Sequence, residues 1–331
     1  MHIEENISIQ PHNTFGMDVR ARYWAEYGSA DELKELLSQY ADVQKCFIGQ
    51  GSNLLFTKDY DGIVLHSSMA RAKAVRETSD EVYIEAQSGL VMDDLIAQLC
   101  DMNLYGMENL SHIPGEVGAS AVQNVGAYGV EAKDVISQVE VLETATGEIH
   151  TLNNQDCKFG YRDSVFKGEQ AGKYVVLNVT FRLSKKAVYK LDYGQLRDVL
   201  PAAPSASAIR NAVIAIRQSK LPEVGQTGSA GSFFKNPIVD KATYEHLRTK
   251  YASMPSYTQA DGYKIPAAWL IEQAGGKSLS MGGAAVYEKQ PLVIINRHNA
   301  TPEDVMALAK MIQDRVEEQF GINLQREVIY I

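Results

Sequence analysis

Residues 111–129 have the sequence SHIPGEVGASAVQNVGAYG, with glycine at positions 115, 118, 126 and 129. Small residues fill four further positions of this segment, 119, 120, 121 and 127. This composition predicts a short helix rather than a long one, because glycine weakens helices. Small side chains also let the backbone approach a flat or phosphorylated ligand closely. The packing of a short helix would explain the segment about equally well.

A second glycine-rich loop, residues 48–56, has the sequence IGQGSNLLF. Its glycines allow backbone N–H groups to face the oxygens of a pyrophosphate, and Ser52 and Asn53 offer further donors. A Rossmann fingerprint requires a third glycine at the start of a helix, but Leu54 stands at that position. The loop alone therefore indicates a tight turn. Two such loops among strands in one half of the chain favour a bound nucleotide-type cofactor.

Apolar periodicity predicts an α+β chain with many strands and few helices in its first half. Ser29 and Thr301 are placed as helix N-caps, and Glu303 is placed to assist the second cap. Thr146-Gly147 separates two strand-like runs and predicts a hairpin. We expect helices over residues 30–40, 91–102 and 207–219, and from the Thr301 cap to about 320. We expect strands over residues 45–48, 62–67, 82–87, 135–144, 148–152, 174–183, 291–296 and 327–331.

The composition limits the classes of function. The chain has 331 residues, of which 45% are hydrophobic and 22% charged, so two or three globular units are expected. A net charge of −9 argues against nucleic acid as the main partner. Three widely spaced cysteines and seven scattered histidines predict reduced thiols and no catalytic metal. No secretory signal pattern and no membrane-spanning apolar run are visible, so we expect a cytoplasmic protein.

Further motifs occur in order outside the two loops: NTF at 13–15, FGYRDSVF at 159–166, GSAGSFFKNP at 228–237, GGAAV at 282–286 and REV at 326–328. With the loops and the strand order, they resemble the FAD-binding domain of the vanillyl-alcohol-oxidase-like flavoproteins, also called the PCMH type. More narrowly, they are similar to the UDP-N-acetylenolpyruvoylglucosamine reductase family, in the longer form that has a tyrosine loop. The resemblance covers nearly the whole chain.

The resemblance implies an FAD-binding domain over residues 1–200, in two α+β subdomains of about 1–68 and 69–200. A smaller α+β substrate-binding domain follows over residues 201–331. FAD is expected to bind non-covalently, because loop 49–53 lacks the histidine or cysteine that tethers flavin in related oxidases. The expected FAD contacts lie in the two loops: Gly49, Gln50, Gly51, Ser52, Asn53, Pro114, Gly115, Gly118, Ala119, Ser120, Gln123, Asn124, Gly126 and Ala127.

The resemblance also implies an activity. In the family, hydride passes from NADPH through FAD to the terminal vinyl carbon of UDP-N-acetylglucosamine enolpyruvate, and the product is UDP-N-acetylmuramate for peptidoglycan synthesis. Negative charge develops toward the substrate carboxylate, and a proton must reach the neighbouring carbon. By family position, Arg162 would hold the carboxylate, Glu327 would help to stabilise the enolate, and Ser232 would donate the proton. Taken without the family, each of these three has an ordinary surface or turn interpretation.

Substrate contacts are expected outside this catalytic set. Tyr193, in the sequence LDYG, matches the tyrosine of a loop that closes over the nucleotide. Ile329 stands where some relatives have a basic residue, which puts one peripheral substrate contact in question. The candidate contacts, several of which could instead be structural, are Tyr128, Tyr193, Arg217, Lys220, Asn236 and Gln290.

Two other functions stay open from the sequence. An FAD-dependent oxidase with the same FAD domain would consume oxygen rapidly with a small alcohol. A nucleotide-sugar binding protein without turnover would have no use for Arg162, Ser232 and Glu327. The expected partners are NADPH and the UDP-sugar enolpyruvate, with no nucleic acid, no membrane insertion and a monomeric state.

Overall fold

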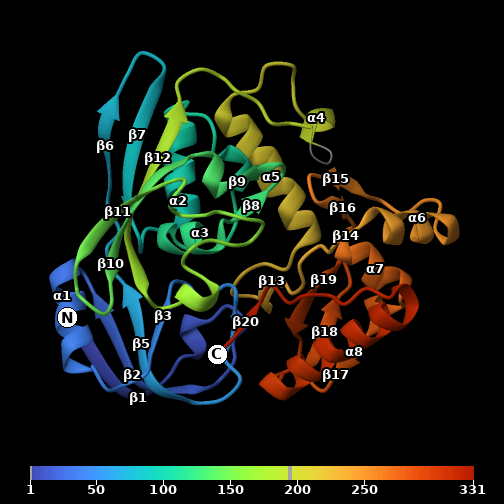
Figure 1. Ribbon diagram of the computed structural model, residues 1–331, viewed down its shortest axis with the longest axis horizontal. Helices are drawn as coiled ribbons and strands as arrows, with labels where there is room; N and C mark the ends of the chain where they lie inside the picture. Colours follow the sequence, from blue (N-terminus) through green and yellow to red (C-terminus); the bar gives the residue numbers. More distant parts are fainter. Residues whose placement is uncertain (1, 193–195) are drawn as a thin grey trace. The chain divides into compact units, whose positions relative to one another are not determined.

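The computed structural model describes residues 2–192 and 196–331 (Figure 1). The chain divides into two compact units. The first comprises Met1–Ile7, Ala21–Gln50 and Asp61–Arg217, and the second comprises Ser8–Arg20, Gly51–Tyr60 and Gln218–Ile331. Two segments from the N-terminal part of the sequence thus pack with the C-terminal part. The assignment of residues 1–200 to FAD and of residues 201–331 to substrate stays a prediction.

The first unit contains a four-stranded sheet with helix α1 (Ala30–Gln39) packed against it. In sheet order, its strands are β1 (His2–Ser8), β2 (Arg20–Tyr27), β5 (Tyr60–Ser67) and β3 (Lys45–Ile48). The Ser29 side chain accepts a hydrogen bond from the Glu32 N–H and so caps α1. Three leucines of α1 pack in one core with Ile63 and Leu65 of β5. The predicted strand over 45–48 and the Ser29 cap are confirmed.

A five-stranded antiparallel sheet forms the rest of the framework of the first unit. In sheet order, its strands are β11 (Ile149–Asn153), β10 (Ile136–Glu143), β12 (Tyr174–Ser184), β7 (Glu81–Gln87) and β6 (Ala72–Glu77). The predicted hairpin of β10 and β11 is confirmed. The central strand β12 contributes to two cores of the first unit. Val175 and Leu177 pack with α1, whereas Val179 and Phe181 pack in a second and larger core.

Two helices supply the other side of the larger core: α2 (Met92–Asp101) and α3 (Val117–Gln123). Leu95, Ile96 and Leu99 of α2 are buried there, as the periodicity predicts. The remaining elements of the unit are β8 (Gly126–Ala127), β9 (Val130–Glu131), α4 (Leu196–Val199) and α5 (Ala206–Lys220), the last of which ends in the second unit. Short 3-10 helices lie at Glu108–Leu110, Ala132–Asp134 and Gly168–Gln170.

The second unit is built on a four-stranded antiparallel sheet and the long helix α8 (Pro302–Phe320). In sheet order, the strands are β13 (Gly228–Ser232), β19 (Gln290–Asn296), β18 (Ala284–Tyr287) and β17 (Ser280–Met281). Thr301 caps α8 as predicted, but the reciprocal bond comes from Asp304 rather than Glu303, because Asp304 occupies the third helical position. Helix α7 (Ala267–Gln273) packs in the same core.

Smaller elements complete the second unit. A three-stranded sheet contains β14 (Ile238–Val239), β16 (Gly262–Lys264) and β15 (Tyr257–Gln259), and helix α6 (Lys241–Lys250) adjoins it. Tyr244 of α6 stacks on Tyr263 with the ring centroids 3.9 Å apart. Strand β20 (Ile329–Tyr330) pairs in parallel with β4 (Leu54–Leu55). Gln10–His12 and Gly276–Ser278 are 3-10 helices. The predicted strand over 327–331 is thus shorter than expected.

Candidate cofactor and catalytic site

The two glycine-rich loops meet in the first unit. The Gly115 N–H donates a hydrogen bond to the Gln50 Oε1 at 2.9 Å. A Cβ on Gly49 would stand 3.0 Å from Oε2 of Glu116, so this glycine lies directly against a carboxylate. The first half of one predicted cofactor loop therefore contacts the start of the other.

Helix α3 is short, as predicted, and its glycine serves close packing. The Gly118 N–H donates to the Ser88 carbonyl, and a Cβ at Gly118 would be 2.8 Å from that of Ser88. The Val117 N–H donates to the Leu90 carbonyl, and the Ser120 hydroxyl donates to the Val117 carbonyl. The Val117 and Gly118 N–H groups thus hold α3 to the chain before α2, whereas the Ser120 hydroxyl bonds within α3. The predicted FAD contacts at Gly118 and Ser120 stay predictions.

The turn over residues 49–53 has backbone donors that the fold does not use. In the described part of the chain, no group accepts a hydrogen bond from the backbone N–H of Gly49, Gln50, Gly51 or Asn53. Gly51 has φ +64°, and a Cβ there would stand 2.4 Å from the His12 carbonyl oxygen. Gly51 is also a buried residue. Buried N–H groups are normally hydrogen-bonded, so this turn has the donors that an anionic ligand requires.

Asn124 connects the second glycine segment to three other places in the first unit. Its side chain is 0% exposed and its backbone is left-handed, with φ +42°. The Nδ2 group donates to the Gly160 carbonyl at 2.7 Å and to Oε2 of Glu131 at 3.2 Å. The Oδ1 atom accepts from the Lys133 N–H at 3.0 Å. Asn124 therefore shapes the segment, and its side-chain polar atoms are already engaged.

Arg162 stands in a tight turn that is fastened to the same segment. The turn is closed by two backbone hydrogen bonds between Gly160 and Asp163, and Arg162 has φ +55°. The Arg162 Nη2 donates to the Gly126 carbonyl at 2.6 Å, and its guanidinium lies 5.3 Å from the Tyr161 ring centre. A Cβ on Gly126 would be 3.0 Å from Nη1 of Arg162. Glycine at position 126 thus admits the guanidinium to the backbone.

Lys167, which the motifs do not include, contacts two of the predicted site residues. Its Nζ donates to Oε1 of Gln123 and to the carbonyl of Arg162, both at 2.9 Å. It therefore joins a predicted FAD contact to the predicted carboxylate-binding residue. Its position directly after the FGYRDSVF motif is the signal that could have found it.

Tyr128 and Arg217 lie at the end of the same segment. Tyr128 has φ +48°, and its carbonyl accepts a hydrogen bond from the Asn109 Nδ2 at 2.8 Å. Burial raises the pKa of the Tyr128 hydroxyl, and the Arg217 charge opposes this rise. The Arg217 Nε donates to the His112 carbonyl at 3.0 Å, and burial lowers the pKa of the guanidinium. The two predicted substrate contacts are thus near each other and held by backbone groups.

The second unit brings Ser232 and Glu327 onto neighbouring stretches of chain. The pairing of β13 with β19 has a bulge between Ser229 and Ser232, where Gly231 takes φ +67°. The Glu327 N–H donates to the Phe233 carbonyl at 2.9 Å, so Glu327 lies beside the residue after Ser232. Ser232 is partly exposed, and no group in residues 2–192 or 196–331 hydrogen-bonds its hydroxyl. A hydroxyl in this position is available to a ligand.

The other predicted residues have simpler surroundings. Asn53 donates to the Glu327 carbonyl at 3.1 Å, and Ala127 pairs with Val130 in the β8–β9 ladder. Asn236 accepts the Ala267 N–H at the start of α7, and Gln290 accepts the Leu292 N–H at 3.4 Å. Lys220 is exposed at the end of α5, and Ala119 is partly exposed. Tyr193 lies outside the described residues.

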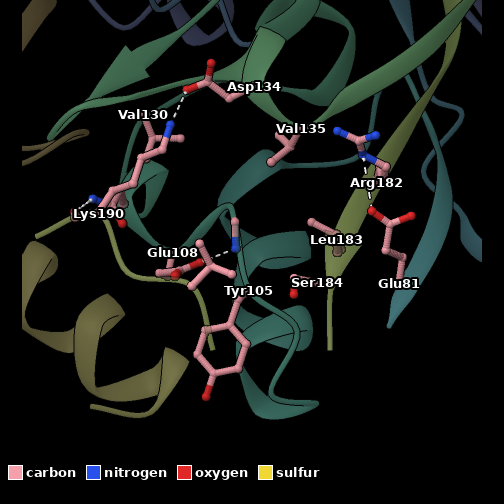
Figure 2. Close-up of a pocket in the computed structure, with 13 residues that line it drawn as sticks. Glu81, Tyr105, Glu108, Val130, Asp134, Val135, Arg182, Leu183, Ser184 and Lys190 are labelled. Carbon is pink, nitrogen blue, oxygen red and sulfur yellow. Dashed lines mark hydrogen bonds and ion pairs between the residues drawn. The ribbon is translucent and has the colours of Figure 1, made fainter. Parts of the chain in front are cut away.

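A cavity of about 230 Å³ lies elsewhere in the first unit (Figure 2). It opens between Tyr105, the end of β12 and the segment that holds Lys190. Lys190 pairs with Asp134 at 3.1 Å, and Arg182 faces Glu81 at 3.7 Å. None of the described residues predicted for the site lines this cavity. Because its cations already face carboxylates, it lacks the free charge that a phosphorylated substrate would need.

Residues 21–153 match the family described as "FAD binding domain". The donor-bearing turn, the fastened glycine segment and this match define a flavoprotein with an FAD-binding domain. Residues 223–331 match the family described as "UDP-N-acetylenolpyruvoylglucosamine reductase, C-terminal domain". In the described residues, no helix combines the length and the apolar character needed to cross a membrane.

Curated relatives with the same name span the full chain. The UDP-N-acetylenolpyruvoylglucosamine reductase of Bacteroides fragilis strain YCH46 is 46% identical, and the match covers 99% of this chain and 100% of the relative. That of Porphyromonas gingivalis strain W83 is 42% identical over 100% of both chains. The chain therefore belongs to the UDP-N-acetylenolpyruvoylglucosamine reductase family.

A solved structure agrees with this assignment at the level of the fold. The UDP-N-acetylenolpyruvylglucosamine reductase of Thermus caldophilus superposes with a TM-score of 0.71 at 21% identity, over 100% of both chains. The predicted α+β fold class is confirmed.

Proposed function

We propose that this chain catalyses the NADPH-dependent, FAD-mediated reduction of UDP-N-acetylglucosamine enolpyruvate to UDP-N-acetylmuramate. Full-length membership of the reductase family supports the reaction. The structural observation that carries the proposal is the bond from Arg162 to the Gly126 carbonyl. It fixes the cation expected to bind the substrate carboxylate against the segment expected to bind the flavin.

FAD is the cofactor of the proposal, and the residues present fit it. The turn over residues 49–53 has unused backbone N–H donors, which suit the negative oxygens of a pyrophosphate. Small residues at positions 119 and 127 leave room for close contact with a flat ring system. When bound, FAD would supply hydride transfer from NADPH to the vinyl carbon of the substrate.

Arg162 would bind the substrate carboxylate. A guanidinium has several N–H donors in one plane, so anchoring Nη2 on the Gly126 carbonyl sets the plane in which the other donors lie. Lys167 helps to hold the turn that contains Arg162, because its Nζ donates a hydrogen bond to the Arg162 carbonyl. A cation held in advance stabilises the negative charge that develops on the carboxylate without reorganising during the reaction.

Ser232 would deliver the proton to the substrate carbon next to the vinyl carbon that receives the hydride. A hydroxyl is a weak acid, so it must act through placement and be reprotonated from water. The proposal is supported by the bulge at Gly231, which precedes the partly exposed Ser232 at the end of β13. Glu327 lies beside the next residue along the chain and would help to stabilise the enolate.

The S232A variant tests this assignment. FAD binding and the reduction of bound FAD by NADPH should persist, while turnover of the enolpyruvate substrate falls by about 10²-fold or more, the scale expected for loss of a positioned acid. Stopped-flow absorbance separates the two steps. Ser229, on the same strand, supplies the matched control variant S229A, which should keep its turnover. Unchanged turnover in S232A would remove Ser232 from the mechanism, and a protein that binds no FAD would refute the function.

The proposal extends to the cellular compartment and the oligomeric state of the protein. The three cysteines are free, which suits a reducing compartment, and we place the protein in the cytoplasm. The large apolar side chains that are exposed, such as Val75, Met102 and Val188, lie in different parts of the first unit, which is consistent with a monomer. A supply of peptidoglycan precursor would connect the enzyme to cell shape and division.

A further inference from the structure

His66 of β5 lies between two carboxylates in the first unit. Its Nε2 is 2.9 Å from Oε1 of Glu116, and its Nδ1 is 3.3 Å from Oε1 of Glu26 on β2. The imidazole stacks on the Trp24 ring with the centroids 5.8 Å apart. The His66 side chain is 21% exposed, whereas that of Glu116 is 7% exposed. Contacts on both ring nitrogens and on the ring face hold the imidazole in one orientation.

Glu116 reaches away from the helix that it precedes. It occupies the N-cap position of α3, but its side chain makes no capping bond. Instead, its carboxylate lies between His66 and Gly49, where a Cβ would stand 3.0 Å from Oε2. A buried carboxylate is thus placed at the entrance to the turn whose N–H donors would receive the pyrophosphate.

A negative charge at this place needs a partner. Burying an unpaired carboxylate costs several kcal/mol, and it would also repel an anionic ligand at the turn. Among the described residues, His66 is the one basic side chain that pairs with Glu116. Burial by itself would lower the pKa of His66, but Glu116 and then Glu26 raise it above its usual value.

The other ionisable groups around His66 do not supply this charge. Glu26 is a second carboxylate and is more exposed, with 40% of its side chain accessible. Tyr27 is buried on β2, and burial, together with the Glu116 charge, raises the pKa of its hydroxyl. Tyr27 is therefore neutral at physiological pH, and the imidazolium of His66 is left to balance Glu116.

We infer that His66 is a positioning residue for the cofactor. As an imidazolium it holds the Glu116 carboxylate beside Gly49 and cancels its charge at the turn that binds the pyrophosphate. The inference rests on the proposed FAD binding. It assigns part of the affinity for FAD to His66, which lies outside both glycine-rich loops, and to Glu116 of the second loop, neither of which is among the expected FAD contacts.

The sign of the pH dependence follows from the charge. Because the pKa of His66 is raised in the folded protein, the imidazolium is present below that pKa and is lost as the pH rises through it. The affinity of the apoprotein for FAD should therefore be constant toward pH 6 and weaken by about tenfold toward pH 9, a range that spans a raised histidine pKa. Quenching of flavin fluorescence measures the dissociation constant directly, without turnover.

Four variants test the pair. H66Q should bind FAD about tenfold more weakly than wild type near pH 6 and lose the pH dependence. E116Q should bind tightly at every pH, and the double variant H66Q/E116Q should match E116Q, because without the carboxylate no cation is needed. H150Q is the matched control, since His150 also lies between two carboxylates, Glu143 and Glu148, but on the β10–β11 hairpin.

The outcomes distinguish a failure of the proposed function from a failure of the positioning role of His66. If wild type binds no FAD, the proposed function fails and the inference fails with it. If wild type binds FAD while H66Q binds equally well with the same pH profile, only the positioning role is refuted. A double variant as weak as H66Q would also refute it, because the defect would then not pass through Glu116. The wild-type and E116Q profiles decide the question even if H66Q does not fold.

Discussion

Replacing Asn124 should destabilise the first unit by an amount that can be worked out from its contacts. The side chain is fully buried and makes three hydrogen bonds, to Gly160, Glu131 and Lys133. Each such bond contributes about 1 kcal/mol net, so their loss costs about 3 kcal/mol. The left-handed backbone, with φ +42°, adds about 1 kcal/mol for alanine but not for glycine. We therefore expect about 4 kcal/mol for N124A and about 3 kcal/mol for N124G.

Urea unfolding followed by circular dichroism measures these differences. Asn103 supplies the control, because it is exposed and also has a left-handed backbone, with φ +53°. N103A should cost only the backbone term of about 1 kcal/mol, and N103G should cost nothing measurable. The reasoning is wrong if N124A falls within about 1 kcal/mol of wild type, or if N124G is less stable than N124A.

Two further variants probe other parts of the first unit. G118A should destabilise by about 1–3 kcal/mol, because the added Cβ would stand 2.8 Å from that of Ser88; a thermal melt that matches wild type would contradict this. Burial raises the pKa of Asp93, but the ion pair with Arg210 and the hydrogen bond from the His112 N–H together lower it below its usual value. The stability that wild type has over R210Q should thus be full above about pH 5 and shrink as the pH falls through the lowered pKa, with an advantage at pH 7 of about 1–3 kcal/mol. Urea midpoints at several pH values measure it, and a difference that does not change with pH would exclude the ion pair as its source.

Regular elements with a clear apolar period were predictable from the sequence. The strand over Lys45–Ile48 is a short run of partly buried to buried residues, and the cap at Ser29 has a local cause, a side-chain oxygen next to free N–H groups. Strand β6 was not predicted, because every residue of this edge strand is exposed and no apolar period marks it. Strand β13 was not predicted either, because its sequence, GSAGS, is polar and glycine-rich and has no apolar period.

The site was predictable as a set of segments but not as a geometry. The motifs predicted that residues 111–129 and 159–166 belong to the site. They did not predict that Arg162 bonds the Gly126 carbonyl or that Asn124 and Lys167 join the two segments. Such contacts depend on how distant parts of the chain fold together. The same holds for the segments 8–20 and 51–60, which pack with the C-terminal part.

The two N-terminal segments of the second unit give the chain a particular order of assembly. Phe15, Met17 and Leu55 are fully buried, but the core that buries them is otherwise supplied by residues after 229. Proteins are synthesised from the N-terminus, so these three side chains leave the ribosome long before their partners exist. A nascent chain that ends near residue 217 has apolar groups with no core to enter. Until the residues after 229 have been synthesised, these side chains stay exposed to solvent, and exposed apolar groups make a nascent chain prone to aggregate.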